Sequence, residues 1–504
     1  MLVATVRIGV DIFFHAVSLK LIYLYQKMKY NKKISSLEAN KLTTMKDKVL
    51  SCFKAYDVRG KLGSEIDDQL AYKIGFAVAK ILRVKKIVVG HDARESSPSL
   101  SSAVTQGILD YGADVLFIGL SGTEEVYAAS SSLKADAGIE VTASHNPIDY
   151  NGFKIVKGNS QPLTDQEFSS IRSMVTNFNF KKQNNKGECI NVKSKAKSLY
   201  IDKILTFVNL ANLEPLKIVI NSGNGAAGPT IDKLCEVLKN KGVKFNFIKV
   251  QHNPDPTFPN GVPNPLLEEN RSITSDFVQS EKADFGVAFD GDFDRCFLFD
   301  HLGNFVPGEY MVGILAQFFL GKEKQAKIVH DSRVIWNTQD VVKNLGGNAV
   351  STKTGHAFVK AVMRDKMAIY GGEISAHHYF RDFYYCDSGM IPWLIVWELL
   401  SKKNLVLSDI IANRTNKFLS SGELNFEILN PHSCLLKVKD RFALEALEID
   451  EIDGLSVTFK DWRFNLRKSN TEPLVRLNLE TRGDAKLLKQ KTQELKNIIV
   501  DCEN

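Results

Sequence analysis

Three groups of side chains in this 504-residue chain are suited to phosphate chemistry. Ser144 lies within Thr-Ala-Ser-His-Asn-Pro (142–147), and aspartates alternate through Asp-Gly-Asp-Phe-Asp-Arg (290–295). A polar run, Arg-Lys-Ser-Asn-Thr (467–471), follows near the end of the chain. A hydroxyl can carry a phosphoryl group, alternating carboxylates can hold a hard cation, and a guanidinium with neighbouring hydroxyls suits a phosphate dianion. Together these groups indicate phosphoryl transfer.

Ser144 follows a predicted strand, residues 138–141 (Gly-Ile-Glu-Val). We therefore expect it at the carboxyl end of a strand, where open α/β sheets bind their ligands. Asn146 and Pro147 favour a tight turn, which would hold the hydroxyl exposed and fixed. Seen alone, such a run more often contains a turn serine that bonds its own backbone. His145 is equally ambiguous by itself.

The acidic run follows another predicted strand, residues 284–290, and Gly291 would let the loop bend. Asp290, Asp292 and Asp294 would repel one another unless a cation neutralised them, and such a loop suits Mg²⁺ or Ca²⁺. Arg295 supplies only one positive charge. The glycine and the closing glutamate of a calcium-binding EF-hand loop are absent. A solvated acidic turn is the alternative, and the preceding strand makes it less favoured.

Two further segments follow predicted strands. Residues 371–378 (Gly-Gly-Glu-Ile-Ser-Ala-His-His) bring an acceptor, a hydroxyl and an imidazole within five residues, a group suited to sugar hydroxyls. Adjacent histidines on an extended chain point in opposite directions, so this pair is a weak metal site. Residues 221–228 resemble a nucleotide-binding turn but lack the GxGxxG spacing, and we predict a structural turn there.

The elements that must position these residues alternate between helix and buried strand from residue 66 to about 419. This alternation predicts three mixed, mainly parallel α/β units in tandem, with a diverged structural repeat as a hypothesis. Beyond them, predicted strands (435–438, 456–459 and 474–479) and a helix (487–498) indicate a smaller C-terminal α+β domain. The predicted divisions are an extension at 1–44 and domains at 45–197, 198–304, 305–418 and 419–504.

Composition limits the function classes. Residues 1–44 contain seven Lys/Arg against two acidic residues, so the remaining 460 residues carry only +2 of the net charge of +7. No nucleic-acid surface is therefore predicted for the body of the protein. The extension has no apolar stretch near the roughly 20 residues that a membrane span needs. It could form an amphipathic surface helix, but we favour an upstream translation start with Met45 as the true one. Seven scattered cysteines without a CxxC pair predict reduced thiols and a cytoplasmic location.

From about Cys52 onward the chain resembles the bacterial phosphomannomutases of the α-D-phosphohexomutase family. The resemblance rests on several motifs in order: Ala-Tyr-Asp-Val-Arg-Gly (55–60), the Ser144 motif, Asp-Tyr-Asn-Gly-Phe-Lys (149–154), the acidic loop, Lys-Thr-Gly-His (353–356), Gly-Glu-Ile-Ser-Ala-His-His (372–378) and Arg-Lys-Ser-Asn-Thr-Glu-Pro (467–473). It implies four domains around a central cleft: in chain order a phosphoserine, a metal-binding, a sugar-binding and a phosphate-binding domain.

The resemblance also implies roles for single residues. Ser144 would be the phosphoserine, and one Mg²⁺ per chain would be held by Asp290, Asp292, Asp294 and a phosphoserine oxygen. Lys154 is the first candidate for the general acid and base, and His145 is the second. The remaining implied residues are Arg59 and Arg295 at the transferring phosphoryl group; Glu373, Ser375, Lys353, His356 and His377 around the sugar; and Arg467, Ser469, Asn470, Thr471 and Arg333 at the second phosphate.

The implied reaction interconverts mannose 6-phosphate and mannose 1-phosphate through a hexose 1,6-bisphosphate, which also acts as the activating primer. Its product would supply GDP-mannose for surface polysaccharide synthesis. The implied partners are small sugar phosphates, with no nucleic acid and no membrane span, and the protein would be a monomer or homodimer.

Several alternatives remain open on the sequence. A phosphoglucomutase or a dual-specificity enzyme would use the same motifs, because mannose and glucose differ only at C2. Phosphoglucosamine mutase is less favoured, since residues 376–380 are similar to the mannose-type loop. An aspartyl-phosphate phosphatase could use the acidic loop but would not need the Ser144 motif. A non-catalytic sugar-phosphate-binding regulator predicts damaged motifs, whereas all of them are intact.

Overall fold

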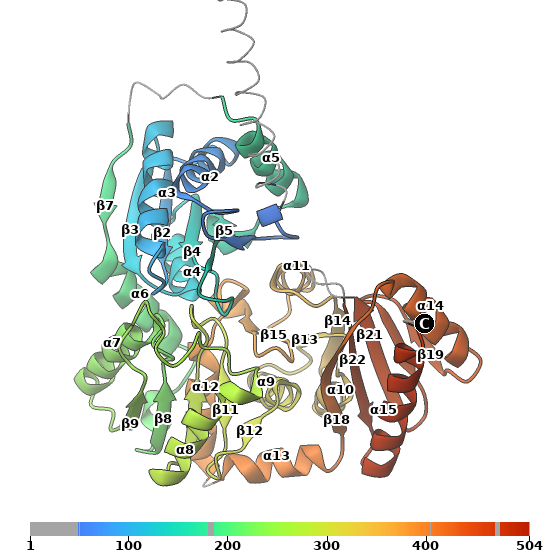
Figure 1. Ribbon diagram of the computed structural model, residues 1–504. Helices are drawn as coiled ribbons and strands as arrows, with labels where there is room; N and C mark the ends of the chain where they lie inside the picture. Colours follow the sequence, from blue (N-terminus) through green and yellow to red (C-terminus); the bar gives the residue numbers. More distant parts are fainter. Residues whose placement is uncertain (1–48, 50, 180–185, 404, 469–473, 503–504) are drawn as a thin grey trace, which may run out of the picture.

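The structure, a computed structural model, describes residues 49, 51–179, 186–403, 405–468 and 474–502. Four sheets follow one another along the chain, and the first three carry helices between their strands (Figure 1). The predicted fold class, three mixed α/β units in tandem plus a smaller C-terminal α+β domain, is confirmed. The extension at 1–44 lies outside the described residues.

The first sheet combines parallel and antiparallel strands. Strands β2, β3, β4 and β7 are parallel, while β1 and β6 pair antiparallel with β5. In spatial order the strands are β1 (Val58–Lys61), β5 (Tyr150–Lys157), β4 (Ala137–Val141), β2 (Lys86–His91), β3 (Asp114–Leu120) and β7 (Cys189–Asn191), with β6 (Gln161–Pro162) beside β5. The helices of this unit are α2 (Asp68–Ile81), α3 (Ser97–Tyr111), α4 (Thr123–Ser132) and α5 (Asp165–Thr176).

The second and third sheets have five strands each. The second runs β9 (Asn246–Val250), β8 (Lys217–Asn221), β10 (Phe285–Ala288), β11 (Phe297–Phe299) and β12 (Phe305–Val306), with helices α7 (Ala227–Asn240) and α8 (Ser272–Ser280). The third runs β14 (Asn348–Thr352), β13 (Lys327–Asp331), β15 (Tyr370–Gly372), β16 (His378–Phe380) and β17 (Cys386–Asp387). Its helices are α9 (Gly308–Lys322), α10 (Trp336–Asn344), α11 (His356–Lys366), α12 (Met390–Lys403) and α13 (Leu407–Thr415).

A common strand order relates these three units. Strands β3-β2-β4-β5, β9-β8-β10-β11 and β14-β13-β15-β16 each consist of three parallel strands followed by an antiparallel one. This order supports the repeat hypothesis. It also places the predicted functional loops at equivalent positions, because Ser144, the acidic loop and Glu373 follow β4, β10 and β15 respectively.

Two elements cross the predicted divisions between units. Helix α6 (Lys193–Leu205) runs through the division at 197/198, and β12, which lies beyond the predicted division at 304/305, pairs with β11 of the second sheet. The units pack closely, since one hydrophobic cluster includes Tyr127 of the first, Ile220 of the second and Trp397 of the third.

The C-terminal sheet is antiparallel and lies at the right of Figure 1. Its order is β18 (Leu419–Glu427), β22 (Leu474–Thr481), β21 (Trp462–Lys468), β20 (Leu455–Thr458) and β19 (Glu448–Asp450), with helices α14 (Pro431–Phe442) and α15 (Ala485–Val500). The strand predicted at 435–438 is wrong, because these residues belong to α14. Cys434, Val438 and Phe442 are buried at helical spacing, and the Asn430 side chain caps the helix.

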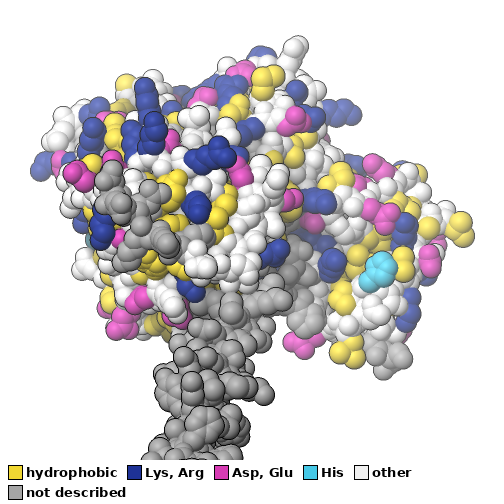
Figure 2. All heavy atoms as spheres, turned by 90° about the horizontal axis from the view of Figure 1, so that it is seen from above, with side chains coloured by type: hydrophobic (Ala, Val, Ile, Leu, Met, Phe, Trp, Pro, Cys, Tyr) yellow, Lys and Arg dark blue, Asp and Glu magenta, His cyan; other side chains and the backbone are white. Residues whose placement is uncertain are grey.

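No helix among the described residues is long and apolar enough to cross a membrane. Basic and acidic side chains are interspersed on the face shown in Figure 2. All seven cysteines are free thiols.

Candidate active site

Ser144 lies in a tight turn beyond β4, as predicted, and the Asn146 amide closes the turn on the Ala143 carbonyl at 3.0 Å. The expectation that its hydroxyl is exposed is wrong, because only 1% of the residue is accessible. Its backbone is left-handed, with φ 53°. Ser144 Oγ donates to Asp290 Oδ2 at 2.7 Å and lies 2.9 Å from His145 Nδ1. The serine loop and the acidic loop thus meet at this hydroxyl.

The acidic loop is buried, with at most 1% of Asp290, Asp292 and Asp294 accessible. Gly291 serves close approach rather than bending, since a Cβ there would lie 2.5 Å from the Ser144 carbonyl oxygen. The left-handed residue of the loop is instead Phe293, with φ 48°. The predicted structural turn at 221–228 packs behind this loop, where the Ala226 amide donates to the Gly291 carbonyl at 3.1 Å.

The three aspartates fit a divalent cation. One ligand oxygen from each lies within 4.8 Å of the others. The Oδ1 atoms of Asp290 and Asp292 are buried without a hydrogen-bond partner among the described residues, and Asp294 Oδ1 lies 3.5 Å from His377 Nε2. Burial and the charges of Asp292 and Asp294 raise the pKa of Asp290 to about 7 against the opposing charges of Arg295 and Lys154, so a cation would stabilise the ionised form of this carboxyl. Buried carboxylate oxygens of this kind are ligands that Mg²⁺ accepts.

Lys154 and Thr123 hold the same carboxylates. Lys154 Nζ donates to Asp292 Oδ2 at 2.7 Å and also contacts Asp294 Oδ2. Burial alone would lower the pKa of Lys154, but Asp292 and Asp294 raise it, so the side chain is an ammonium. Thr123 Oγ1 at the start of α4 donates to Asp292 Oδ2 at 2.5 Å. No sequence motif pointed to Thr123.

His145 differs electrostatically from Lys154. Burial, followed by the charge of Arg295, holds the pKa of His145 well below its usual range, so its ring is neutral at neutral pH. A neutral ring beside Ser144 Oγ can accept a proton, whereas an ammonium cannot. Arg59 also contacts this turn and donates to Asn146 Oδ1 at 2.7 Å.

The loop after β15 brings Glu373 and His377 to the acidic loop. Arg295 Nε lies 3.2 Å from His377 Nε2, and the two residues form an isolated β-bridge between the second and third units. Glu373 accepts hydrogen bonds from the Gly355 amide at 2.7 Å and from the Tyr379 hydroxyl at 2.5 Å. Burial opposes ionisation of Glu373, but His377 lowers its pKa to about 2. Glu373 is therefore a fixed carboxylate acceptor.

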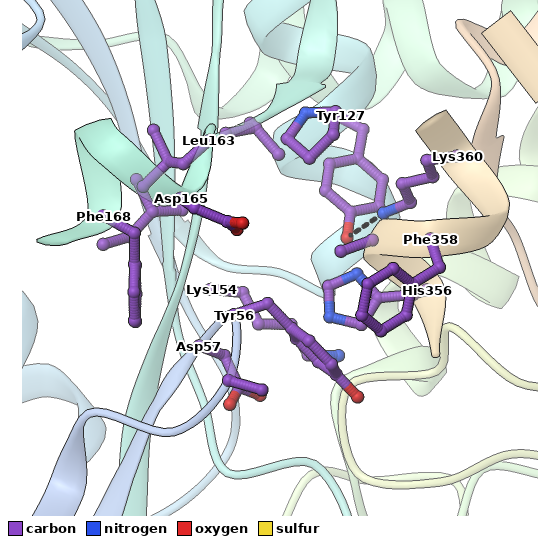
Figure 3. Close-up of a pocket in the computed structure, with 15 residues that line it drawn as sticks. Tyr56, Asp57, Tyr127, Lys154, Leu163, Asp165, Phe168, His356, Phe358 and Lys360 are labelled. Carbon is purple, nitrogen blue, oxygen red and sulfur yellow. Dashed lines mark hydrogen bonds between the residues drawn. The ribbon is translucent and has the colours of Figure 1, made fainter. Parts of the chain in front are cut away.

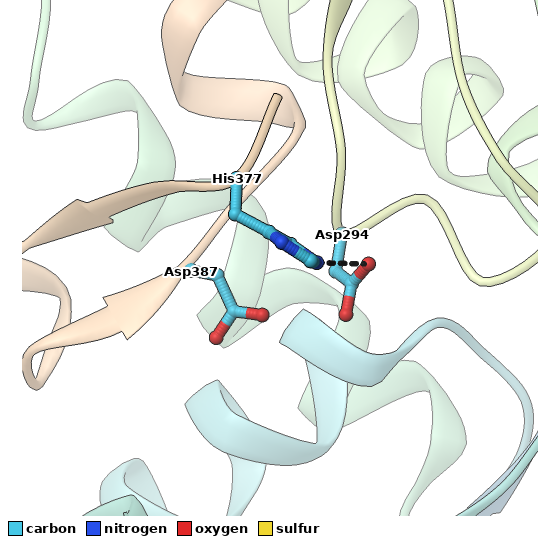
Figure 4. A group of neighbouring side chains, drawn as sticks. All are labelled: Asp294, His377 and Asp387. Atoms are coloured by element: carbon cyan, nitrogen blue, oxygen red, sulfur yellow. Dashed lines mark ion pairs between the residues drawn. The ribbon is translucent and has the colours of Figure 1, made fainter. Parts of the chain in front are cut away.

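His377 also lies beside Asp387, and these two residues with Asp294 form a second group of ligand atoms (Figure 4). Side chains already neutralise this group. Lys360 Nζ pairs with an Asp387 oxygen at 2.5 Å, and although burial and Arg295 oppose it, hydrogen bonds with Asp294 and Glu373 raise the pKa of His377, which favours a cationic ring that cannot bind a metal. The aspartates of the acidic loop are thus the better cation site.

A cavity of about 60 Å³ opens beside Lys154, between the first unit and α11 (Figure 3). His356 and Tyr56 line it, and their rings meet edge to face with centroids 4.6 Å apart. Both ring nitrogens of His356 are buried without a hydrogen-bond partner among the described residues. His356, which is predicted to bind the sugar, can therefore form hydrogen bonds with a ligand in this cavity.

Arg333 and Arg467 meet at one carboxylate, that of Glu423 on β18. Their guanidinium nitrogens lie 3.4 Å and 3.1 Å from Glu423 Oε2. Arg333 also pairs with Asp331 at 2.6 Å and donates to Ser375 Oγ at 3.4 Å. Sequence reasoning missed Glu423 and Asp331, which carry no motif.

Four other predicted residues add no geometry to the site. Lys353 is exposed just beyond β14. Ser469, Asn470 and Thr471 lie outside the described residues. Of the predicted phosphate clamp, the described residues include Arg467 alone.

Comparisons with known proteins cover almost the whole described chain. Four domain families, each described as phosphoglucomutase/phosphomannomutase, match it in order: alpha/beta/alpha domain I at residues 51–182, domain II at 198–303, domain III at 307–418 and the C-terminal domain at 423–497.

Named relatives and solved structures agree with these matches. The chain is 50% identical over 451 residues to a phosphomannomutase of Salmonella montevideo, which covers 89% of this chain and 99% of the relative. It is 48% identical over 453 residues to a Xanthomonas campestris protein described as phosphohexose mutases, with the same coverage. A crystal structure of a Burkholderia thailandensis phosphoglucomutase/phosphomannomutase family protein matches with a TM-score of 0.78 at 29% identity, covering 90% of this chain and 98% of that one. The fold is also that of Aspergillus fumigatus N-acetylphosphoglucosamine mutase solved with GlcNAc-6P and magnesium, with a TM-score of 0.57 at 14% identity, covering 92% and 99%.

Proposed function

Because the chain belongs to the phosphoglucomutase/phosphomannomutase family and is an isomerase of the phosphomannomutase kind, we propose that it interconverts mannose 6-phosphate and mannose 1-phosphate. The reaction would proceed through a phosphoserine at Ser144 and a hexose 1,6-bisphosphate. The observation that carries this proposal is the 2.7 Å contact between Ser144 Oγ and Asp290 Oδ2. It sets a hydroxyl directly against a buried carboxylate loop that fits a cation.

Phosphoryl transfer would occur in two halves at Ser144. In the first, the C1 hydroxyl of mannose 6-phosphate attacks the phosphorus, the bond from phosphorus to Ser144 Oγ breaks, and the 1,6-bisphosphate forms. The sugar then reorients without leaving the site. In the second half Ser144 Oγ attacks the 6-phosphate, and mannose 1-phosphate is released. The 1,6-bisphosphate would also prime any unphosphorylated chain.

The proton at Ser144 Oγ needs a carrier, and His145 is better placed for this than Lys154. In the first half its neutral ring would take the proton of the attacking C1 hydroxyl and pass it to Oγ as Oγ leaves. In the second half it would take the proton from Oγ as Oγ attacks and pass it to O6 of the sugar as the bond to the 6-phosphate breaks. Lys154, Arg59 and Arg295 would remain cations that stabilise charge on the transferring oxygens. Mg²⁺ held by the three aspartates would supply further positive charge there.

Substrate binding would use the other loops. Glu373 and Ser375 would accept and donate hydrogen bonds to the sugar hydroxyls, with His356 and His377 beside them. Arg333 and Arg467 would bind the phosphate that is not reacting, with Ser469, Asn470 and Thr471 added to the clamp. The product would then be a substrate for the nucleotidyl transfer that makes GDP-mannose for surface polysaccharide.

The test is a coupled assay on mannose 6-phosphate and on glucose 6-phosphate, with Mg²⁺ and a glucose 1,6-bisphosphate primer. We expect turnover of the mannose substrate, and loss of detectable turnover and of one phosphate by intact mass in Ser144→Ala. The matched control is Ser99→Ala, an exposed serine of the same unit, which should retain both. Inactivity of the wild-type protein on both sugars would defeat the proposal, and equal turnover of the two would replace it with a dual-specificity enzyme.

A further inference from the structure

Arg94, just beyond β2, is an arginine to which neither the motifs nor the reaction assigned a role. It is 2% exposed and donates hydrogen bonds to four backbone carbonyls of the Ser144 loop. One terminal nitrogen reaches the carbonyl oxygens of Ser144 at 2.9 Å and Asn146 at 2.6 Å. The other reaches Pro147 at 2.8 Å and Tyr150 at 3.0 Å. A single guanidinium therefore fixes both arms of the loop.

The guanidinium is itself held in place. Asp92 Oδ2 lies 3.4 Å from Arg94 Nε, and Asp92 Oδ1 accepts the Arg94 amide at 3.0 Å and the Ser97 hydroxyl at 2.5 Å. The Phe258 ring, from the second unit, lies 5.9 Å from the guanidinium carbon. The unit that carries the acidic loop thus covers the same arginine.

Ser144 needs such support because its backbone is left-handed, with φ 53°. Residues other than glycine rarely adopt this conformation, and they keep it only where the surroundings fix it. The Ser144 amide donates to Thr142 Oγ1 at 2.8 Å, while its carbonyl is bound by Arg94. The peptide groups on both sides of the serine are therefore fixed, and the side chain that they direct reaches Asp290.

We propose that Arg94, with the Thr142 hydroxyl, is a positioning residue that sets the backbone of Ser144 so that Oγ faces the acidic loop. This inference rests on the proposed role of Ser144 as the phosphoryl carrier. The planar fork of arginine serves four carbonyls at once, which the single ammonium of lysine cannot do. Arg94→Lys keeps the charge but releases part of the loop.

The experiment compares Arg94→Lys with Arg271→Lys in the full-length protein. Arg271 is a matched control, because it also binds two loop carbonyls, at 3.0 Å and 2.6 Å, and stacks on a phenylalanine ring, but those carbonyls belong to Pro265 and Leu266 of the second unit. We expect kcat of R94K to fall about 100-fold, the order of loss that a misplacement of about 1 Å produces. KM for mannose 6-phosphate should change little, and R271K should keep the wild-type kcat.

Two further measurements separate positioning from general stability. Guanidinium ion added to Arg94→Ala should restore part of kcat, and should not act on Arg271→Ala. Thr142 is 1% exposed, and Thr142→Val keeps its shape while removing the hydroxyl. This variant should also lower kcat at unchanged KM. It tests the inference if the Arg94 variants do not fold. Wild-type kcat in folded R94K, or in T142V, overturns the inference. Absence of phosphoserine from the wild-type protein would instead defeat the proposed function.

Discussion

Lys154 pairs with the same carboxylates of the acidic loop that are proposed to bind Mg²⁺. In the structure its ammonium contacts Asp292 and Asp294, two of the three carboxylates proposed to bind Mg²⁺. Without a cation, this contact compensates most of the charge buried in the loop. The protein should therefore remain folded when Mg²⁺ is removed, because the lysine still neutralises these carboxylates. It should nevertheless lose activity, since the proposed reaction needs the metal.

The corresponding variant is Lys154→Met. In EDTA at neutral pH we expect its free energy of unfolding to fall by about 3–5 kcal/mol, since two buried carboxylates lose their partner. Urea denaturation with and without Mg²⁺ measures this loss, and added Mg²⁺ should stabilise the variant more than the wild-type protein. The control is Lys157→Met on the same strand, whose partly exposed pair with Glu167 should contribute at most about 1 kcal/mol. An Mg²⁺ effect equal to that of the wild-type protein would contradict this account.

At the level of single residues, the sequence predicted the residues that belong to motifs, but not the residues that hold them in place. Ser144 and the three aspartates could be predicted because polar residues follow buried strands in recognisable order. Thr123 could not, since its contact with Asp292 joins residues 169 positions apart and depends on how two units pack. The burial of Ser144 was missed for the same reason. The covering groups come from other loops.

Helix α4 links the first unit to the third at the level of whole elements. Its Glu124 side chain accepts hydrogen bonds from the amides of Gly389 and Met390, at 3.1 Å and 3.2 Å, and from the Ser388 hydroxyl. These groups form the start of α12, so a carboxylate of one unit caps a buried helix of another. The preceding residue, Thr123, holds Asp292, and the same helix start therefore positions part of the acidic loop.

Glu124→Ala tests this interdomain cap. We expect a loss of about 3 kcal/mol or more in unfolding free energy, because a buried carboxylate that accepts several donors is removed. Thermal or urea denaturation measures the loss, and hydrogen exchange should show faster exchange at the start of α12. The control, Glu167→Ala, removes a partly exposed carboxylate that caps its own helix α5 and pairs with Lys157 of the same unit, and should cost about 1 kcal/mol. Similar losses in the two variants would show that the cap does not join the units.

The secondary structure of the first three units could be predicted from the sequence, whereas helix α14 could not. Alternating strands and helices of the first three units could be predicted because buried parallel strands are short apolar runs between amphipathic helices. Residues 435–438 (Leu-Leu-Lys-Val) resemble another short strand, yet they lie in α14. There the helical spacing of Cys434, Val438 and Phe442 determines the packing, and a four-residue window cannot distinguish the two periods.

In the whole molecule, the C-terminal domain docks on the loop that carries Arg333. Arg463 donates to the carbonyl oxygens of Arg333 at 2.8 Å and Ser332 at 3.1 Å. Glu480 accepts the amides of Ile335 and Trp336, at 2.8 Å and 3.1 Å, at the start of α10. The two docking residues also pair with each other at 2.8 Å. This contact sets the distance between Arg333 and Arg467, which belong to different domains.

Glu480→Gln should therefore affect substrate binding without affecting the acidic loop. An amide in place of the carboxylate turns a donor toward the helix start and weakens the pair with Arg463, so the two phosphate-binding arginines lose their fixed separation. We expect KM for mannose 6-phosphate to rise about tenfold, equivalent to about 1.4 kcal/mol of binding energy. The phosphate content of Ser144 and Mg²⁺ binding, measured by intact mass and calorimetry, should not change. Glu494→Gln, on the outer side of the same domain, serves as the control. An unchanged KM in folded Glu480→Gln would mean that the domain binds phosphate independently of how it is docked.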